Sequence, residues 1–493
     1  MAAFLIAMTG CQKESPVDQN ESTGASDVYV SFTIQAIETK SSTATEDGDD
    51  YGSSNANPDI EVGYDYENKI SKVDIVLRNG LTYVSATAVT PDVEDNTGAD
   101  KTNFPKKYIA RFNSSVLNTD TPYDIYVYAN CDSRQDLNAV SNADITAMTQ
   151  ANHFWMTNAY AQTVEFAKFS TNENDPTPLG DVYVERAMAR FDYKNNGSYD
   201  LGNNVKITLT HAALINHSKG FYLIRRVSTD GKDNNWTIGG VETKINYVVD
   251  TDFEAKADGY QIGDKENFES PLAGGLNTWT FESLELVTED NWTGEDGLDG
   301  FKLWRYAKEN TIPGEETQVN GLSTGIVFKG KLSGEVIENA NKAPIYVFNN
   351  TLYGTWENVK TAATAQDAPE DLKYAVSACS DANGNAKKNA VLAAAGFTSY
   401  VYETDGYYAY YYYWNRHNDN NDNTNMGKME FAVVRNNVYK LCVDTIAKFG
   451  HPGPGGADPD PVDPTDPDEQ GEYYFSVSVK VVPWVVRVNH IGW

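Results

Sequence analysis

The chain has 493 residues, enough for two or three domains at roughly 150 residues each. Its 70 acidic residues outnumber 39 basic ones and leave a net charge of −31, so its surface repels nucleic-acid phosphates and anionic membranes, and we expect no nucleic-acid partner. Tyrosine is frequent, at 31 residues, and runs rich in Tyr, Thr and Val are punctuated by Gly, Asn and Asp, which indicates β-structure and an all-β fold.

The first residues form a short apolar run that ends in Gly10-Cys11. This run resembles a bacterial lipoprotein signal and predicts a leader over residues 1–11 with Cys11 as the lipidated residue. It departs from a usual leader because it is short and has no basic residue before it; a chance apolar start is the alternative. We found no other apolar stretch approaching the ~18 residues that a membrane-spanning helix needs.

Residues 12–40 are expected to be a polar tether followed by a first strand. From Asp27 to Ile37 apolar residues alternate with mostly polar ones, which is the period of a half-buried strand. The apolar face of this strand consists of Val28, Val30, Phe32, Ile34 and Ala36.

Short alternating runs separated by turn residues then predict a β-sandwich over residues 41–181 and a second one over residues 182–449, with the boundary near Leu179–Val182. The expected strands include 72–77, 108–112, 123–130, 205–209, 221–224 and 325–332. The best short-helix candidate is Ala139–Gln150, and Met429–Val443 is expected to form two strands around an Arg-Asn-Asn turn.

Residues 450–472 are rich in Pro, Asp and Gly, which predicts an extended, unpaired linker with a reach on the order of 70 Å. Beyond it, residues 473–493 contain a second alternating strand, with Phe475, Val477, Val479 and Val481 on one face, followed by Pro483 and Trp484. A tethered strand of the same kind as the first predicts a polymer subunit, in which one copy donates its last strand to another. The alternative is a strand that folds back on its own domain.

The chain offers little support for catalysis or metal binding, and we expect neither a cofactor nor an enzyme. Gly325–Leu332 imitates a phosphate-binding loop but lacks the hydroxyl residue after its Lys. His211 and His217 have no metal-pair spacing, and Asp419, Asn421 and Asn423 resemble a calcium loop without its Gly and closing acid. We expect Cys131, Cys379 and Cys442 to be buried as small apolar residues.

The run Tyr407–Trp414 contains six tyrosines and a tryptophan. As a strand it would carry aromatic side chains on both faces. A packed ladder between strands is one interpretation. A glycan-stacking platform, as in an adhesin, is the other.

Several segments together resemble the Bacteroidales fimbrillins, the type V pilus subunits, and most of all the major stalk subunit of short fimbriae. They are the Gly-Cys leader end, Tyr123–Asn130, Phe154–Asn158, Val184–Arg190, Trp414–Asn418, Val433–Tyr439 and Val481–Trp484. The resemblance implies two transthyretin-like β-sandwich domains in tandem with a tethered C-terminal donor strand. It further implies export as a lipidated precursor to the bacterial outer membrane.

The resemblance also implies that a protease removes the first strand after Arg or Lys. The first Arg, Arg78, lies inside an expected strand, so the cut is placed after Lys40, which leaves Ser41 as the new first residue. Either the processing protease accepts Lys, or this subunit is not cut and serves another role. The donor strand of another copy would then fill the vacated groove and build an extracellular fimbrium that supports adhesion. The expected partners are copies of the same chain, accessory tip and anchor subunits, the processing protease and a host protein or glycan. The alternative function is a surface lipoprotein or pilus-tip adhesin that binds glycan or host protein.

Overall fold

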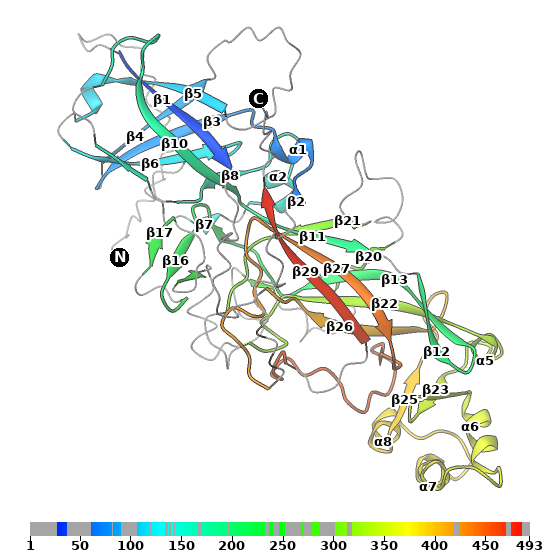
Figure 1. The fold of residues 1–493 in the computed structure, drawn as a ribbon. Coiled ribbons are helices and arrows are strands. Elements are labelled where there is room, and N and C mark those ends of the chain that lie inside the picture. Colours follow the sequence, from blue (N-terminus) through cyan, green and yellow to red (C-terminus); the bar gives the residue numbers. More distant parts are fainter. Residues whose placement is uncertain are drawn as a thin grey trace, which may run out of the picture.

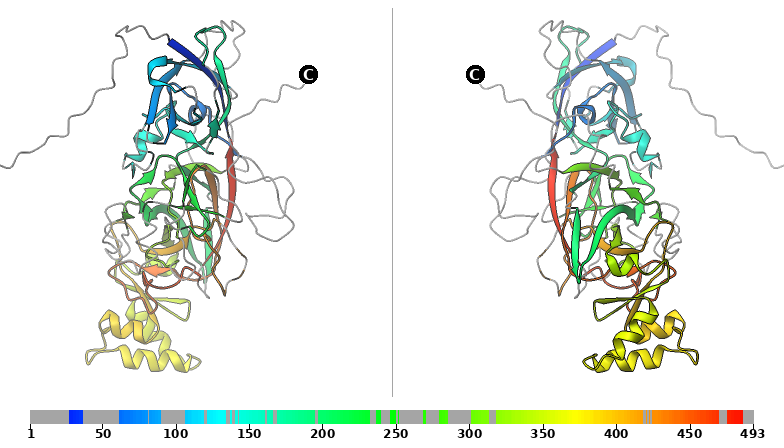
Figure 2. Two further views of the ribbon diagram at one scale, coloured as in Figure 1. Left: turned by 90° about the vertical axis from the view of Figure 1, so that its left-hand side faces the viewer. Right: turned by 90° about the vertical axis from the view of Figure 1, so that its right-hand side faces the viewer.

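The computed structural model describes residues 27–36, 61–80, 82–89, 106–118, most of 121–231, short stretches between 236 and 284, residues 301–312, 318–417, most of 420–469, and 475–485. These residues form an elongated molecule, with the strand that begins the described chain at one end and a group of short helices at the other (Figures 1 and 2). Strands predominate, as expected for an all-β chain.

The first sheet has eight strands in the order β3-β4-β5-β1-β10-β8-β6-β9, and an additional pairing of β3 with β6 closes the order into a ring. Its core includes the buried face of β1 and the buried residues of β3 and β6. The strands are β1 (Asp27–Ala36), β3 (Val73–Asn79), β4 (Thr82–Val89), β5 (Lys106–Asn113), β6 (Tyr123–Ala129), β8 (Met156–Asn158), β9 (Gln162–Val164) and β10 (Thr177–Arg186).

Short turns of helix lie beside this sheet. They are α1 (Asp65–Asn68), the 3-10 turn η1 (Ser114–Val116) and α2 (Ile145–Met148). The helix α2 falls inside the segment expected to be helical. Asp144 caps its start, and the side chain of Asp144 accepts a hydrogen bond from the amide of Thr146, as is usual where a helix begins.

The second part of the molecule contains two larger sheets, in the orders β2-β29-β27-β11-β21 and β12-β13-β22-β26-β28, with β20 also pairing β13. Their strands are β2 (Glu61–Val62), β11 (Ala189–Lys194), β12 (Ser198–Gly202), β13 (Val205–Ile215), β20 (Glu282–Ser283), β21 (Lys302–Ala307), β22 (Gly325–Ser333), β26 (Tyr408–Trp414), β27 (Asn437–Ile446), β28 (His451–Pro452) and β29 (Phe475–Val485). A second core joins residues of both sheets, for example Phe191, Leu441 and Phe328. The passage from the first sheet to these sheets lies between Arg186 and Ala189, a few residues beyond the expected boundary.

Smaller sheets pack beside these. They are β7 (Val140–Ser141) with β15 (Phe221–Tyr222), β14 (His217–Ser218) with β19 (Phe268–Glu269), and β16 (Arg226–Ser228) between β17 (Thr237–Ile238) and β18 (Tyr247–Val249). Of the two strands expected in Met429–Val443, only the second forms. Residues before the turn make a single bridge, from Val433 to Asn310, and Asn436 takes a φ of 58° at the turn.

The far end of the molecule is a helical lobe, residues 335–400, which was not among the elements expected from the sequence. It consists of α5 (Glu335–Glu338), α6 (Trp356–Ala363), α7 (Glu370–Cys379) and α8 (Asn389–Ala394) with the small sheet of β23 (Ile345–Phe348), β24 (Thr351–Gly354) and β25 (Phe397–Tyr400). Its alanine-rich runs favour helix, and a capping box between Thr355 and Asn358 starts α6. The lobe has a core of its own around Trp356, Leu372 and Phe397.

Candidate strand-exchange site

The first strand, β1, lies in the interior of the first sheet, between β5 and β10 (Figure 1). It runs antiparallel to β5, from Asp27 opposite Asn113 to Ile34 opposite Lys106. It runs parallel to β10, from Val30 opposite Thr177 to Ala36 opposite Val184. Because it is paired on both sides, its removal would break two ladders and open the ring.

The apolar face of β1 points into the core of this sheet, as its alternation predicted. Val28 and Phe32 are at most 4% exposed, and Val30 and Ile34 are fully buried. The ring of Phe32 stacks on Tyr108 of β5 with 5.8 Å between their centroids. The side chain of Ala36, and the expected processing residues Lys40 and Ser41, lie outside what the structure describes, as does Cys11.

The last strand, β29, is folded back on its own chain. It pairs antiparallel with β27, from Phe475 opposite Ile446 to Pro483 opposite Asn437. Along this ladder Val477, Val479 and Val481 stand at the register positions of Val443, Leu441 and Tyr439, all three of which are fully buried. Further along, Trp484 is the register partner of Glu61 in β2. Of the two alternatives for this strand, folding back describes this molecule.

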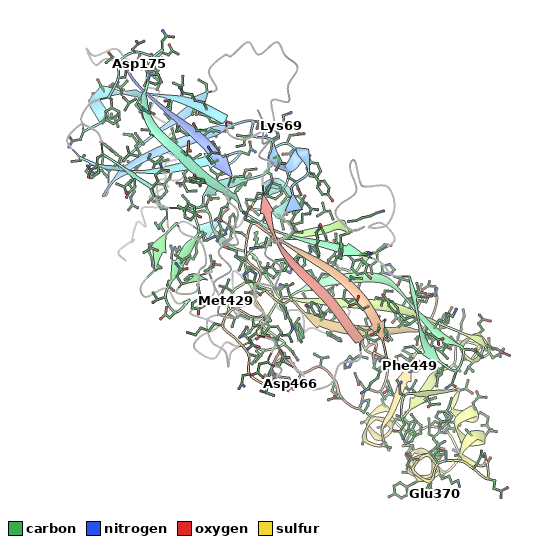
Figure 3. The ribbon with its side chains drawn as sticks, in the orientation of Figure 1. Lys69, Asp175, Glu370, Met429, Phe449 and Asp466 are labelled. Carbon is green, nitrogen blue, oxygen red and sulfur yellow. The ribbon has the colours of Figure 1, made fainter. Side chains whose placement is uncertain are left out.

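The Pro/Asp/Gly segment was expected to be an open linker, and over residues 450–469 this expectation is wrong. Figure 3 labels Phe449 just before this segment and Asp466 near its end. Carbonyl oxygens of Pro464 and Asp466 accept hydrogen bonds from Gly321 and Asn320, over 2.8 and 2.9 Å. The reason is that a proline-rich backbone, already extended and short of donors, still offers carbonyl acceptors to a neighbouring loop.

The aromatic run forms β26, a strand between β22 and β28. Tyr408, Tyr410, Tyr411 and Trp414 are all at most 6% exposed, and Tyr410 donates its hydroxyl hydrogen to Glu403 over 2.7 Å. Burial on both faces agrees with the packed-ladder interpretation. The residues Tyr410 and Trp414, on which a glycan platform would depend, are not presented to solvent.

Two motifs far apart in the sequence, Val184–Arg190 and Val433–Tyr439, meet where the first sheet passes into the second. The amide of Asn436 donates to the carbonyl of Met188 over 2.8 Å. The side-chain oxygen of Asn436 in turn accepts from the amide of Arg186, over 3.0 Å. These contacts tie the start of β27 to the link between β10 and β11.

Buried ion pairs surround this junction. The guanidinium of Arg435 contacts Glu309 at 2.5 Å and donates to the carbonyls of Tyr222 and Leu223. Glu185 pairs with Arg225, and both side chains are essentially without exposure to solvent. Burial raises the pKa of Glu185 to about 7, against the opposing positive charges of Arg225 and Arg435.

A second buried cluster joins α1 to the second part of the molecule. Arg190 of β11 binds Asp192 through two contacts of 2.7 Å and reaches Glu67 of α1 at 3.2 Å. Glu67 also accepts the hydroxyl hydrogen of Tyr306 on β21, over 2.5 Å. Removing one member of such a cluster would leave an uncompensated buried charge. The two parts of the molecule are therefore joined by specific contacts whose loss would lower the stability of the fold.

Among the described residues, the other candidates from the sequence do not gather into one site. Gly325–Leu332 is part of strand β22 rather than a loop. Cys131, Cys379 and Cys442 are buried and unbridged, as expected for small apolar residues. Within the part of the chain that the structure describes, no three metal-ligating side chains gather, and Asp419, Asn421 and Asn423 lie outside it. Among the described residues, no helix has both the length and the apolar character needed to cross a membrane.

A family described as "Major fimbrial subunit protein type IV, Fimbrillin, C-terminal" matches residues 404–490, which span β26, β27, the proline-rich segment and β29. Over these residues the chain is similar to the fimbrillins. This match covers the returning strand, β29, and the strand on which it lies, β27. No curated protein matches the chain. A crystal structure of a candidate cell-adhesion protein from Bacteroides eggerthii aligns with 95% of this chain and 99% of its own, at 12% identity and a TM-score of 0.35.

Proposed function

We propose that this protein is a fimbrillin, a structural subunit of a fimbrium, and that it polymerises head to tail by donor-strand exchange after a protease has removed β1. The observation that carries this proposal is the interior position of β1, between β5 and β10. A strand at an edge could be lost with little consequence. An interior strand leaves behind two unpaired ladders and an apolar groove, which another strand can fill.

The energetics favour filling the groove. The four buried side chains of β1, Val28, Val30, Phe32 and Ile34, contribute roughly 6–12 kcal/mol at about 1.5–3 kcal/mol each. The last strand has a similar length, with 11 residues against 10 in β1, and the same alternation of apolar residues. A donor strand of this pattern would restore both the apolar contacts and the backbone hydrogen bonds.

The pairing of β29 with β27 of the same chain is compatible with this scheme. In the uncleaved chain β1 fills the first sheet and β29 covers the edge of β27. Covered edges protect a β-protein from uncontrolled association. Loss of β1 would create the vacancy that makes departure of β29 towards another copy favourable. Because donor and acceptor are different surfaces, the assembly grows as an open filament.

The finer steps belong to the same proposal. The precursor would be lipidated at Cys11 and held at the bacterial outer membrane, and a cut after Lys40 would free β1. The two parts of the molecule would correspond to two transthyretin-like domains. Accessory tip and anchor subunits would complete an extracellular fimbrium that supports adhesion. The match to a major fimbrial subunit, a structural family, supports this class of function over an enzymatic one.

The test is a variant that lacks residues 473–493, produced in cells that process the full-length chain. We expect it to be exported and trimmed but to remain monomeric, as measured by electron microscopy and size-exclusion chromatography. Adding a synthetic peptide of residues 473–493 should stabilise the trimmed monomer against unfolding. Filaments of normal length from the shortened variant would contradict donor-strand exchange.

The first residue of protein sheared from cells gives an independent test of processing. Ser41 at the amino terminus of filament material supports the cut after Lys40. An acylated Cys11 in the filaments would show instead that β1 is retained, and the exchange scheme would fail at its first step.

A further inference from the structure

The proline-rich segment makes hydrogen bonds to its own subunit in two separate stretches. In the first, Ala457 is 2% exposed and belongs to the core of the helical lobe. Its amide donates to the hydroxyl oxygen of Ser399 over 2.9 Å, and its carbonyl accepts from the amide of Ser399 over 3.1 Å. The side-chain amide of Asn389 donates to the carbonyl of Gly455 over 3.0 Å. The segment therefore completes the fold of the lobe.

The second stretch is residues 463–469, which we call the tail clasp. It lies along residues 318–323. Besides the bonds from Asn320 and Gly321, the amide of Asp468 donates to the carbonyl of Gln318 over 3.1 Å. The side chain of Asn320 donates to the carbonyl of Asp463 over 3.1 Å, and Val319 forms a β-bridge with Pro467. These contacts, with one isolated β-bridge among them, hold the clasp against the loop.

Charged groups close the end of the clasp that leads to β29. Asp468 is 2% exposed and accepts the hydroxyl hydrogen of Ser323. The next residue, Glu469, has a side chain only 6% exposed and lies 2.6 Å from Arg416. Arg416 also contacts the buried Glu430. Withdrawing Glu469 would leave this arginine with one carboxylate fewer in a site that excludes most water, which is unfavourable.

We propose that the tail clasp stays docked on its own subunit when β29 is donated, so that each link between subunits begins at Glu469. This inference rests on the proposed strand exchange. Departure of β29 breaks its ladders with β27 and β2, and neither ladder involves the clasp. Opening the clasp as well would break the bonds at residues 318–323 and expose the buried carboxyl groups of Asp468 and Glu469.

A docked clasp shortens the distance that the free chain before β29 can span to another subunit. If the whole segment from residue 450 were free, it could span on the order of 70 Å. If the chain is held up to Glu469, the residues up to Phe475 can span only about 20 Å, at roughly 3.3–3.6 Å per residue. The acceptor groove of the neighbour must then lie close to the clasp. The filament would have a nearly fixed spacing and angle between successive subunits.

A disulfide that locks the clasp tests the proposal. Val319 and Pro467 are bridge partners, and directly opposed residues in antiparallel pairs have the Cα separation that a disulfide spans. We expect the full-length V319C/P467C variant, oxidised and then processed, to polymerise at the same rate with and without reductant, a ratio near one. Polymerisation that begins only after reduction would overturn the proposal.

A matched lock on β29 separates this inference from the proposed function. Ser478 stands opposite the native Cys442 in the ladder with β27. The S478C variant, oxidised, should not polymerise until reductant is added. If it polymerises while locked, strand donation itself is wrong. If it behaves as expected but the clasp-locked variant also needs reductant, only the fixed clasp is wrong.

Hydrogen exchange of the unmodified chain gives a second readout that needs no variant. The clasp bonds hold three amides, those of Asn320, Gly321 and Asp468. The amides along β27 lie instead in the strand that pairs with β29. We expect the three clasp amides to exchange at the same rate in monomer and polymer. Faster exchange of these amides in the polymer, by an order of magnitude or more, would show that the clasp opens.

Discussion

The backbone amide of Arg186 donates to the side chain of Asn436 across 3.0 Å, although 250 positions separate the two residues in the chain. Arg186 ends β10, the strand beside β1, and Asn436 immediately precedes β27, the strand beside β29. The end of β10 is thus bonded, at one buried point, to the residue just before β27, and these are the two strands that the proposed exchange would expose. Anything that loosens this point should loosen both parts of the molecule together.

Replacing Asn436 tests that bond and the backbone conformation separately. Asn436 has a φ of 58°, which Asn and Gly tolerate. We expect N436G to lower the free energy of unfolding by about 1–3 kcal/mol, because the buried amide of Arg186 loses its acceptor. N436A should cost about 1–2 kcal/mol more, since alanine disfavours this conformation. Urea unfolding measures both.

Asn341, with a φ of 49° in an exposed turn, is the matched control for the effect of the backbone conformation on stability. N341G should change the free energy of unfolding little. Equal effects of N436G and N341G would mean that the hydrogen bond between Asn436 and Arg186 does not contribute to the free energy of unfolding.

The buried ion pair of Arg435 and Glu309 should contribute far more to the free energy of unfolding than an exposed ion pair does. Glu309→Gln leaves the guanidinium of Arg435, fully buried, without its charged partner, and we expect a loss of about 3–5 kcal/mol in the free energy of unfolding. The exposed pair of Asp27 and Arg111, at 2.9 Å, is the comparison. Arg111→Gln should cost less than about 1 kcal/mol. Similar losses in the two variants, measured by chemical denaturation, would contradict this ranking.

Glu185 should make the stability depend on pH. Burial raises the pKa of Glu185 from its ordinary 4.5 to about 7. Between those values the folded chain keeps a proton that the unfolded chain releases, so the free energy of unfolding falls as pH rises. At 1.36 kcal/mol per pH unit the fall attributable to this group is about 3 kcal/mol.

The variant E185Q cannot titrate at this position, so its unfolding free energy should fall correspondingly less over the same pH range. Denaturant unfolding at a series of pH values measures the difference between the two slopes. Parallel curves for the native chain and E185Q would show that Glu185 stays ionised in the folded state.

Gly456 should be required for the proline-rich segment to pack on the lobe. A Cβ atom there would lie 2.2 Å from the carbonyl oxygen of Ser399, closer than any real contact. We expect G456A to detach this part of the segment, with a loss of about 1–3 kcal/mol and faster cleavage by a protease near residue 456. In G453A the nearest atom, 3.3 Å away, is the movable carboxylate oxygen of Glu403, so cleavage should stay slow. Equal cleavage of both variants would count against the packed segment.

Sequence patterns predicted which segments form strands better than they predicted which segments lie next to one another. The alternation in β1 identified its buried residues, Val28, Val30, Phe32 and Ile34, because a strand with one wet face and one dry face must repeat every two residues. The helical lobe was missed although its alanine-rich runs favour helix. The packing of the proline-rich segment was also missed, because composition describes how a free backbone behaves and not which loop lies beside it.

The sequence by itself determined that two strands of one pattern lie near opposite ends of the chain, and which side chains of the first would be buried. Only the tertiary structure decided that the first lies inside a closed ring of strands, that the last returns to β27, and that residues 463–469 are held against their own subunit. The reason is physical: side-chain alternation selects a face, whereas backbone donors and acceptors are alike along every strand. Their partners are chosen by contacts between residues hundreds of positions apart, such as Arg186 and Asn436.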